Sequence, residues 1–164
     1  QPAVGDVAPD FTVKSVDGVE LSLSALTEKG AVVLAFFPKA FTPGCTAELK
    51  AYVTHYDAIK RAGGEVLVVS SDDELTSRKF RDSLAAPYHF VADRKLELIK
   101  AYDVKGFLFP ISKRVTFVLG AGRTVLAVEE GGAAVDPRKA VATCTLHAQN
   151  AVNLVTRDGG SSGP

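Results

Sequence analysis

The hydrophobic residues of the chain fall into short continuous runs separated by longer amphipathic stretches. Residues 31–37 (AVVLAFF) are all apolar, and residues 65–71 (EVLVVSS) carry a similar run. Continuous apolar runs of this length are typical of strands that are buried on both faces. The segment between them places apolar residues at helical spacing instead: Leu49, Tyr52, Val53, Tyr56 and Ile59. A strand, a helix and a second strand are therefore predicted in succession.

The same alternation continues over the rest of the chain. Further strands are predicted at residues 11–13, 19–21, 88–92, 115–119 and 124–129, and further helices at about 73–84, 95–102 and 137–155. Buried strands separated by helices predict an α/β fold. The short turn at 120–123 makes the last two strands antiparallel, so the central sheet must be mixed. We expect one domain over residues 1–157, followed by a flexible tail rich in glycine and serine at 158–164.

Composition narrows the classes of function. The 164 residues include 19 basic and 19 acidic side chains, and this balance does not favour nucleic acid or an anionic membrane as a partner. No apolar stretch approaches the roughly 20 residues that span a bilayer. The two cysteines and three histidines lack the spacing of a metal site, and no cofactor is expected. So few cysteines favour a cytoplasmic location, although a chain that begins at Gln1 leaves a periplasmic or exported one open.

Cys45 lies where the first long strand passes into the first long helix. Thr42 suits the N-cap, and Pro43 suits the first helical position, where a missing N–H costs nothing. Cys45 then falls within the first helical turn, where free N–H groups and the helix dipole favour a thiolate over a thiol. Because its neighbours are polar and tightly turned, we interpret Cys45 as a reactive sulfur rather than as a small core residue.

The spacing Pro38-x-x-x-Thr42-x-x-Cys45 resembles the active-site signature of the peroxiredoxins, in the AhpC/TSA superfamily. It is most similar to their bacterioferritin-comigratory, or Q-type, branch. Residues 4–11 (VGDVAPDF) resemble the opening segment of that family, and residues 112–119 (SKRVTFVL) resemble the strand that carries its active-site arginine. The resemblance implies a thioredoxin-like fold, with a mixed central sheet flanked by helices.

The resemblance also implies a function, that of a thiol-dependent peroxidase acting on hydrogen peroxide and organic hydroperoxides. Cys45 would become a sulfenic acid, which thioredoxin or another thiol would reduce. The functional positions of the family carry over to Cys45, Thr42, Arg114 and Pro38, with Glu48 and Gly44 in support. A peroxide sensor or a chaperone-like holdase on the same fold is the alternative. The chain is expected to be a monomer or a homodimer.

These residue types suit peroxide chemistry. An arginine is always cationic and presents several donors, so Arg114 can stabilise the thiolate and brace the peroxide. The Thr42 hydroxyl and the N–H of Gly44 can add donors, while Pro38 stiffens the loop and Glu48 can orient the arginine. Ordinary explanations stay open for three of them. Arg114 can be a solvated strand end, Thr42 only a cap, and Glu48 a residue favoured by the helix dipole.

Many members of that branch carry a second, resolving cysteine five residues after the first, and others carry it in the helix after the second strand. Lys50 occupies the first of these positions here, and residues 72–84 contain no cysteine. Cys144 is the remaining candidate, because residues 143–146 (TCTL) resemble the resolving segment of other peroxiredoxin branches. Cys144 also lies on an apolar helical stripe over residues 141–155, so that a core role is the alternative.

Overall fold

The computed structural model describes residues 1–161, with side chains as far as Leu154, and contains a central five-stranded sheet in the order β5-β4-β3-β6-β7. Its strands are β3 (Val32–Phe36), β4 (Glu65–Ser70), β5 (His89–Ala92), β6 (Val115–Leu119) and β7 (Val125–Glu130). Strands β3, β4 and β5 run parallel, whereas β6 is antiparallel to both β3 and β7. The predicted mixed α/β sheet is therefore confirmed.

Alternate residues of β3 belong to two separate cores, one on each face of the sheet. Val33 and Ala35 join one hydrophobic cluster, whereas Val32, Leu34 and Phe36 join the other. Because both faces are covered, every position of the strand is buried. This double burial explains the continuous apolar run in the sequence.

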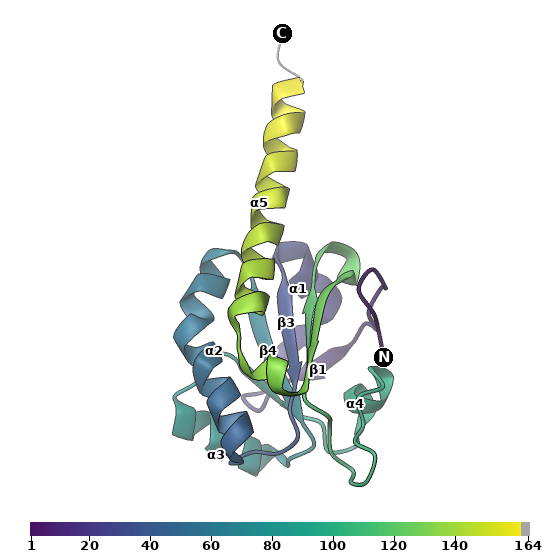
Figure 1. Ribbon diagram of the computed structural model, residues 1–164, viewed down its shortest axis with the longest axis vertical. Helices are drawn as coiled ribbons and strands as arrows, with labels where there is room; N and C mark the ends of the chain where they lie inside the picture. Colours follow the sequence, from purple (N-terminus) through teal and green to yellow (C-terminus); the bar gives the residue numbers. More distant parts are fainter. Residues whose placement is uncertain (162–164) are drawn as a thin grey trace.

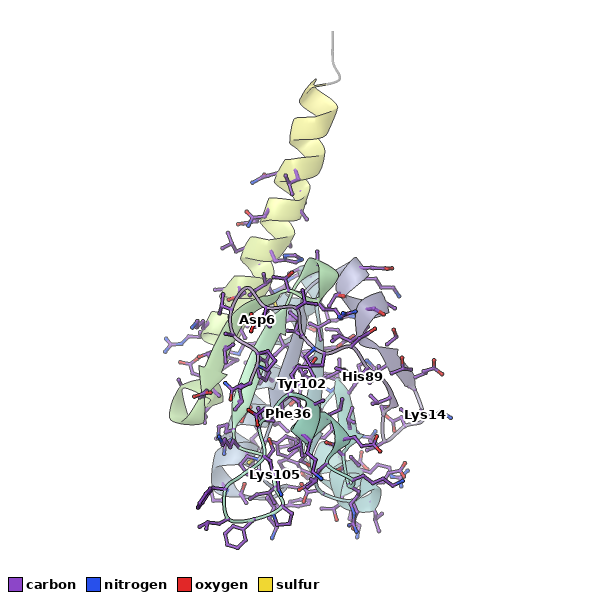
Figure 2. All side chains as sticks on the ribbon, turned by 90° about the vertical axis from the view of Figure 1, so that its right-hand side faces the viewer. Asp6, Lys14, Phe36, His89, Tyr102 and Lys105 are labelled. Carbon is purple, nitrogen blue, oxygen red and sulfur yellow. The ribbon has the colours of Figure 1, made fainter. Side chains whose placement is uncertain are left out.

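Helices cover both faces of the sheet (Figure 1). They are α1 (Leu23–Lys29), α2 (Pro43–Arg61), α3 (Glu74–Leu84), α4 (Glu97–Ala101) and α5 (Arg138–Ser161), together with the short 3-10 helices η1 (Ala121–Arg123) and η2 (Gly131–Val135). Side chains of α2, α3 and α5 pack into the cluster that contains Val33. Those of α1 and α4 pack into the other cluster, where the Phe36 and Tyr102 rings lie with centroids 5.4 Å apart (Figure 2).

The chain begins with a small separate hairpin. Strands β1 (Thr12–Lys14) and β2 (Glu20–Ser22) lie within one residue of the two predicted strands, and they pair antiparallel. The sequence pattern does not predict α1, which follows directly. Its N-cap is Ser22, whose hydroxyl accepts a hydrogen bond from the Ala25 N–H at 3.4 Å. Only Leu23 and Thr27 of its seven residues are buried, which is too short a pattern to indicate a helix.

The last helix is longer than predicted. It begins after Asp136, as expected, but continues to Ser161 and projects beyond the sheet (Figure 1). The prediction of a flexible tail from residue 158 was therefore wrong for residues 158–161, and residues 162–164 lie outside the described residues. Once a helix has formed, each further residue adds a hydrogen bond, so the glycines at 159–160 weaken the helix without ending it.

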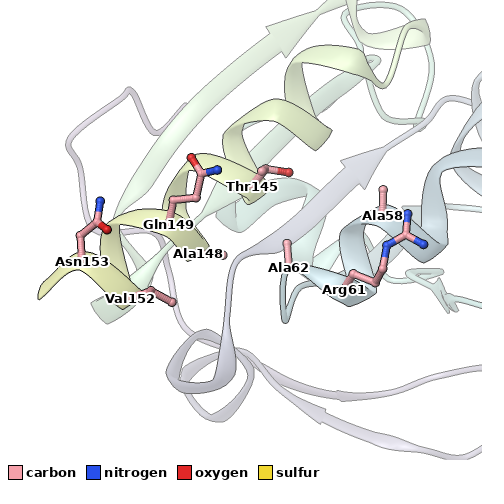
Figure 3. Close-up of a pocket in the computed structure, with 8 residues that line it drawn as sticks. All are labelled: Ala58, Arg61, Ala62, Thr145, Ala148, Gln149, Val152 and Asn153. Atoms are coloured by element: carbon pink, nitrogen blue, oxygen red, sulfur yellow. The ribbon is translucent and has the colours of Figure 1, made fainter. Parts of the chain in front are cut away.

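A groove of about 460 Å³ lies between α5 and the last turn of α2 (Figure 3). Its lining residues are Ala58, Arg61, Ala62, Thr145, Ala148, Gln149, Val152 and Asn153. With a rise of about 1.5 Å per residue, Ala58 lies about 20 Å along α2 from Cys45. The groove is therefore remote from the start of α2, where the candidate thiol lies.

Candidate active site

Thr42 and Pro43 start α2 as predicted. Thr42 has the extended backbone of an N-cap residue (φ −82°, ψ 151°), and Pro43 is the first helical residue. The Thr42 hydroxyl makes no capping hydrogen bond; it donates instead to the Lys39 carbonyl oxygen at 2.8 Å. The hydroxyl thereby closes the turn that leads into the helix.

The segment between β3 and α2 is fixed to the end of β4. The Ala40 N–H donates to Asp72 Oδ2 at 2.8 Å, and the Ser70 hydroxyl donates to the same oxygen at 2.8 Å. Phe41 has a left-handed backbone (φ 64°), which costs a non-glycine residue roughly 1–2 kcal/mol. Its ring packs against Phe80, with the centroids 5.0 Å apart.

The sequence did not identify the role of Asp72. By residue type either Asp72 or Asp73 could cap α3, and the structure assigns that role to Asp73, which accepts a hydrogen bond from the Thr76 N–H at 2.7 Å. Asp72 instead holds the segment that carries the candidate thiol. A hydrogen bond between residues 32 positions apart leaves no periodic signal in the sequence.

Cys45, Arg114 and Glu48 meet at the first turn of α2. Cys45 lies in that turn, and its side chain is fully buried. Arg114 donates from Nη2 to Cys45 Sγ at 3.3 Å and from Nη1 to Glu48 Oε1. The Arg114 side chain is 15% exposed, whereas that of Glu48 is 0% exposed. One guanidinium therefore holds the sulfur and a buried carboxylate at once.

The register of the sheet explains this meeting. Strand β6 is antiparallel to β3, and Val115 pairs with Phe36, so that the start of β6 lies beside the end of β3. The chain leaves β3 toward Cys45, and Arg114 directly precedes Val115. Two residues 69 positions apart in the sequence are thereby brought into contact.

The arginine passes very close to Gly44. A Cβ atom built on Gly44 would lie 2.9 Å from Arg114 Nη2, closer than real Cβ contacts. Any side chain at this position would therefore displace the nitrogen that binds the sulfur. Glycine is needed here for the close approach, which is a reason distinct from backbone freedom.

The ion pair is buried and has unusual acid–base properties. Burial raises the pKa of Glu48 to about 7, although Arg114 lowers it, and Glu129 adds to the rise. Burial lowers the pKa of Arg114, but Glu48 and Cys45 raise it on balance, so the guanidinium stays cationic. The second carboxylate oxygen, Glu48 Oε2, is buried without a hydrogen-bond partner. Glu48 is therefore a carboxylate that can change charge near neutral pH.

Cys144 lies in α5, fully buried in the same hydrophobic cluster as Cys45. Both cysteines are free. Burial raises the pKa of Cys144 to about 12, so this side chain is a thiol at neutral pH. Its surroundings are those of a core residue, which is one of the two alternatives left open by the sequence.

Pro38 lies half-buried in the segment after β3. A surface depression of about 360 Å³ is lined by Lys113, Arg114, Val115, Glu130 and Gly131.

Over the part of the chain that the structure describes, no cluster of three or more His, Cys, Asp or Glu side chains could hold a metal ion. Within the same residues, no helix is long and apolar enough to cross a membrane.

Fold and site together define a class: an α/β protein whose helix-start thiol is bound by an arginine that directly precedes the neighbouring strand. The sequence model of the AhpC/TSA family matches residues 4–128. The chain belongs to this family, and the resemblance to peroxiredoxins noted in the sequence is confirmed.

Individual relatives support the same branch. Peroxiredoxin bcp1 of Schizosaccharomyces pombe is 39% identical over 97 residues, which are 59% of this chain and 50% of the relative. The chloroplastic Peroxiredoxin Q of Suaeda salsa is 35% identical over 125 residues, 76% of this chain and 58% of the relative. The chain thus spans only about half the length of these curated relatives.

A solved structure confirms the thioredoxin-like fold. The crystal structure of Peroxidoxin BcpB from Mycobacterium tuberculosis matches with a TM-score of 0.79 and 31% identity. The match covers 86% of this chain and 95% of that one. The likeness therefore extends over nearly the whole of the α/β body.

Proposed function

We propose that the chain is a thiol-dependent peroxidase that reduces hydrogen peroxide and organic hydroperoxides through a sulfenic acid at Cys45. The observation that carries this proposal is the contact of Arg114 Nη2 with Cys45 Sγ at 3.3 Å, made while Glu48 holds the other end of the guanidinium. A fixed cation beside the sulfur can stabilise the negative charge that the reaction moves away from it. A fully buried thiol also suits a very small substrate such as a peroxide.

In the first step the Cys45 thiolate attacks one peroxide oxygen along the O–O axis. The S–O bond forms as the O–O bond breaks, and the sulfur is oxidised by two electrons to the sulfenic acid. The other oxygen leaves as hydroxide or alkoxide and takes a proton from solvent. Negative charge moves from sulfur to oxygen during this step. Because the Arg114 guanidinium has several N–H donors, it can stabilise the charge on both atoms without moving.

The remaining signature residues support this step. Gly44 leaves room for the guanidinium, and its N–H and that of Cys45 belong to the first turn of α2, where N–H groups lack helical partners and can donate to the reacting atoms. Thr42 holds the preceding turn through Lys39, which places the helix start. Pro38 limits the flexibility of the segment after β3. In this proposal Thr42 and Pro38 shape the site, while Cys45 and Arg114 touch the reacting atoms.

An external thiol completes the cycle. The thiolate of thioredoxin or of another thiol attacks the Cys45 sulfenic sulfur, and the S–O bond breaks as the S–S bond of a mixed disulfide forms. The oxygen leaves as hydroxide, which takes a proton from solvent and becomes water. A second thiolate then attacks the partner sulfur of the mixed disulfide and releases Cys45 in the reduced form. Burial of Cys144 as an un-ionised thiol makes it a poor attacking group, so we assign it a role in the core. Because Cys45 is itself buried, the reductant needs the start of α2 to open locally.

We propose the cytoplasm as the location, since a chain with free thiols suits a reducing compartment. The oligomeric state expected from the sequence is a monomer or a homodimer. Neither assignment enters the mechanism, which uses groups of one chain alone.

Steady-state reduction of hydrogen peroxide, with thioredoxin and its reductase, tests the proposed function. Replacement Cys45→Ser should abolish turnover, because serine has no accessible anion, and Arg114→Lys should slow it about 100-fold, since a point charge cannot replace a planar fork. Cys144→Ser is the matched control and should keep turnover. A single stoichiometric oxidation without turnover would favour a peroxide sensor, and full activity of Cys45→Ser would contradict the mechanism.

A further inference from the structure

The loop between α4 and β6 carries three consecutive large apolar side chains that lie in solvent. Phe107 is 96% exposed, Leu108 is 77% exposed and Phe109 is 64% exposed. Phe107 is the most exposed of the large hydrophobic residues that the structure describes. Single exposed apolar residues are common on protein surfaces, but a run of three is a feature of binding surfaces.

Backbone hydrogen bonds hold this loop in a defined shape. Lys105 and Ser112 form an antiparallel bridge, and the Gly106 N–H donates to the Ile111 carbonyl oxygen at 2.7 Å. The two arms of the loop are therefore paired, and residues 107–110 form its tip. The exposure of the apolar side chains is thus a property of an ordered turn.

The tip lies close to the active site. The loop leads directly into Arg114, whose Nη2 lies 3.3 Å from Cys45 Sγ. Phe109 precedes Arg114 by five residues, so their Cα atoms are at most about 18 Å apart. The loop and the start of α2 lie at the same end of the molecule, the lower end in Figure 1. A partner that binds the tip is therefore held beside the thiol.

The charge of the loop identifies the kind of partner. Residues 104–114 include Lys105, Lys113 and Arg114 and no acidic residue. Arg114 is bound to Glu48, whereas the two lysines are exposed at the base of the loop, and Lys105 is labelled near the lower end of Figure 2. Equal numbers of basic and acidic side chains over the whole chain do not favour an anionic membrane, but the charge of this loop is positive.

We propose that residues 105–113 bind the surface of an anionic lipid bilayer. Phe107, Leu108 and Phe109 enter the boundary between headgroups and acyl chains, while the two lysines stay among the anionic headgroups. A narrow tip makes little contact with a flat protein surface, whereas a fluid bilayer closes around it on all sides. This favours a membrane over a protein partner.

Membrane binding would also define a class of substrate, and this part of the proposal rests on the proposed function. A hydroperoxide group on an acyl chain is polar, so it favours the bilayer surface over the hydrocarbon interior. Binding through the tip places Cys45 and Arg114 beside that surface. The substrates would then include hydroperoxides of membrane lipids, which the Cys45 thiolate would reduce to the lipid alcohols by the same attack on the O–O bond.

A tryptophan at the tip tests insertion directly, because the chain contains no other tryptophan. The emission of Phe107→Trp should shift to shorter wavelength with vesicles of phosphatidylcholine and phosphatidylglycerol in equal parts, and less with phosphatidylcholine alone. The shift should decrease in 1 M salt, which screens the lysines. Leu146→Trp is the matched control: Leu146 is 57% exposed on α5, which leads away from this end (Figure 1), and its emission should not change.

Flotation with the same vesicles measures the two contributions separately. Phe107→Ser combined with Leu108→Ser should lower the partition coefficient at least about tenfold. Lys105→Gln combined with Lys113→Gln should lower it about 25-fold on the anionic vesicles, at about fivefold for each charge, and leave it unchanged on the neutral ones. The tip variant should keep its rate with hydrogen peroxide but lose reduction of a phospholipid hydroperoxide in vesicles, whereas Leu146→Ser should keep both.

The alternative occupants give different results. Failure of the unmodified protein to float with anionic vesicles, together with an unshifted Phe107→Trp emission, would overturn the proposal. If the tip variant instead raised the KM for thioredoxin, the tip would bind the protein reductant, and if it dissociated a dimer in sedimentation, the tip would bind a second copy. Lack of hydrogen peroxide reduction by the unmodified protein would contradict the proposed function, and the vesicle measurements would still decide membrane binding.

Discussion

Next to Cys45, the Arg114 side chain passes very close to the helix backbone at Gly44. A Cβ on Gly44 would meet Arg114 Nη2 at 2.9 Å, and that nitrogen is the end of a flexible side chain. Gly44→Ala should therefore displace the guanidinium rather than the fold. We expect the rate of Cys45 oxidation by peroxide to fall about 10- to 100-fold, as for a misplaced catalytic group, while the free energy of unfolding changes by less than about 1 kcal/mol.

Gly132 offers a matched control for this substitution. A Cβ built on Gly132 meets nothing within 4 Å, and its backbone is not left-handed. Gly132→Ala should leave the peroxide rate unchanged. Equal rates in Gly44→Ala and the unmodified protein, measured by stopped-flow fluorescence or competition with another peroxidase, would show that the close approach of Arg114 has no role in catalysis.

The residues that touch the sulfur could be predicted because local chemistry and spacing both indicate them. Cys45 lies at a helix start, and Arg114 and Glu48 follow from the resemblance to the family. Asp72 shows the limit of this reasoning. The partner of Asp72 is a backbone N–H distant in the sequence.

At the scale of elements, the path from β3 into α2 depends on one carboxylate. Asp72 Oδ2 accepts hydrogen bonds from the Ala40 N–H and from the Ser70 hydroxyl, and both donors belong to buried residues. Asp72→Ala should cost about 1–3 kcal/mol of unfolding free energy by leaving these donors without a partner. Hydrogen exchange at the Ala40 amide should become faster, since the segment loses its attachment to β4.

Asp73→Ala distinguishes this effect from general destabilisation. It removes the N-cap of α3, which should cost about 1 kcal/mol, but it leaves the Ala40 contact in place. Exchange at Ala40 should then follow the overall stability alone. If both variants accelerate Ala40 exchange to the same extent, Asp72 does not hold the segment.

Strands and helices could be predicted where burial on both faces, or a long amphipathic face, produces a clear pattern of apolar residues in the sequence. The run at β3 and the stripe of α2 are of this kind, and both were placed correctly. Helix α1 could not be found, because its seven residues have too few buried positions for a period to appear. The end of α5 was misjudged because glycines in the sequence indicate a free-energy cost of helix formation. They do not indicate the backbone hydrogen bonds that extend a helix once it has formed.

At the scale of the whole molecule, Glu48 links stability to pH. Burial raises its pKa from 4.5 to about 7, so the folded state binds a proton that the unfolded state has already released over this range. The stabilisation is fully present below pH 4.5 and is lost as pH rises through 7. The shift corresponds to about 3 kcal/mol, and the free energy of unfolding should fall by about that amount relative to Glu48→Gln between pH 4.5 and 8.

Urea unfolding of both proteins across this pH range measures the difference directly. The other titratable groups are common to the two proteins, so their contributions cancel in the comparison. Parallel stability curves for the unmodified protein and Glu48→Gln would show that Glu48 ionises as readily in the folded state as in the unfolded one.

The fate of the oxidised sulfur also involves the whole molecule, because Cys45 and Cys144 are free cysteines of two different helices, α2 and α5. Both are fully buried, and burial raises the pKa of Cys144 to about 12, so a disulfide would require partial release of α2 or α5 and ionisation of a poor acid. We expect one equivalent of hydrogen peroxide to add one oxygen to the intact mass, or to give a mixed disulfide when a small thiol is present. Excess peroxide should then over-oxidise Cys45, since no internal partner traps the sulfenic acid. Cys144→Ser should give the same masses. A loss of two hydrogens that is absent in Cys144→Ser would contradict this expectation and make Cys144 the resolving cysteine.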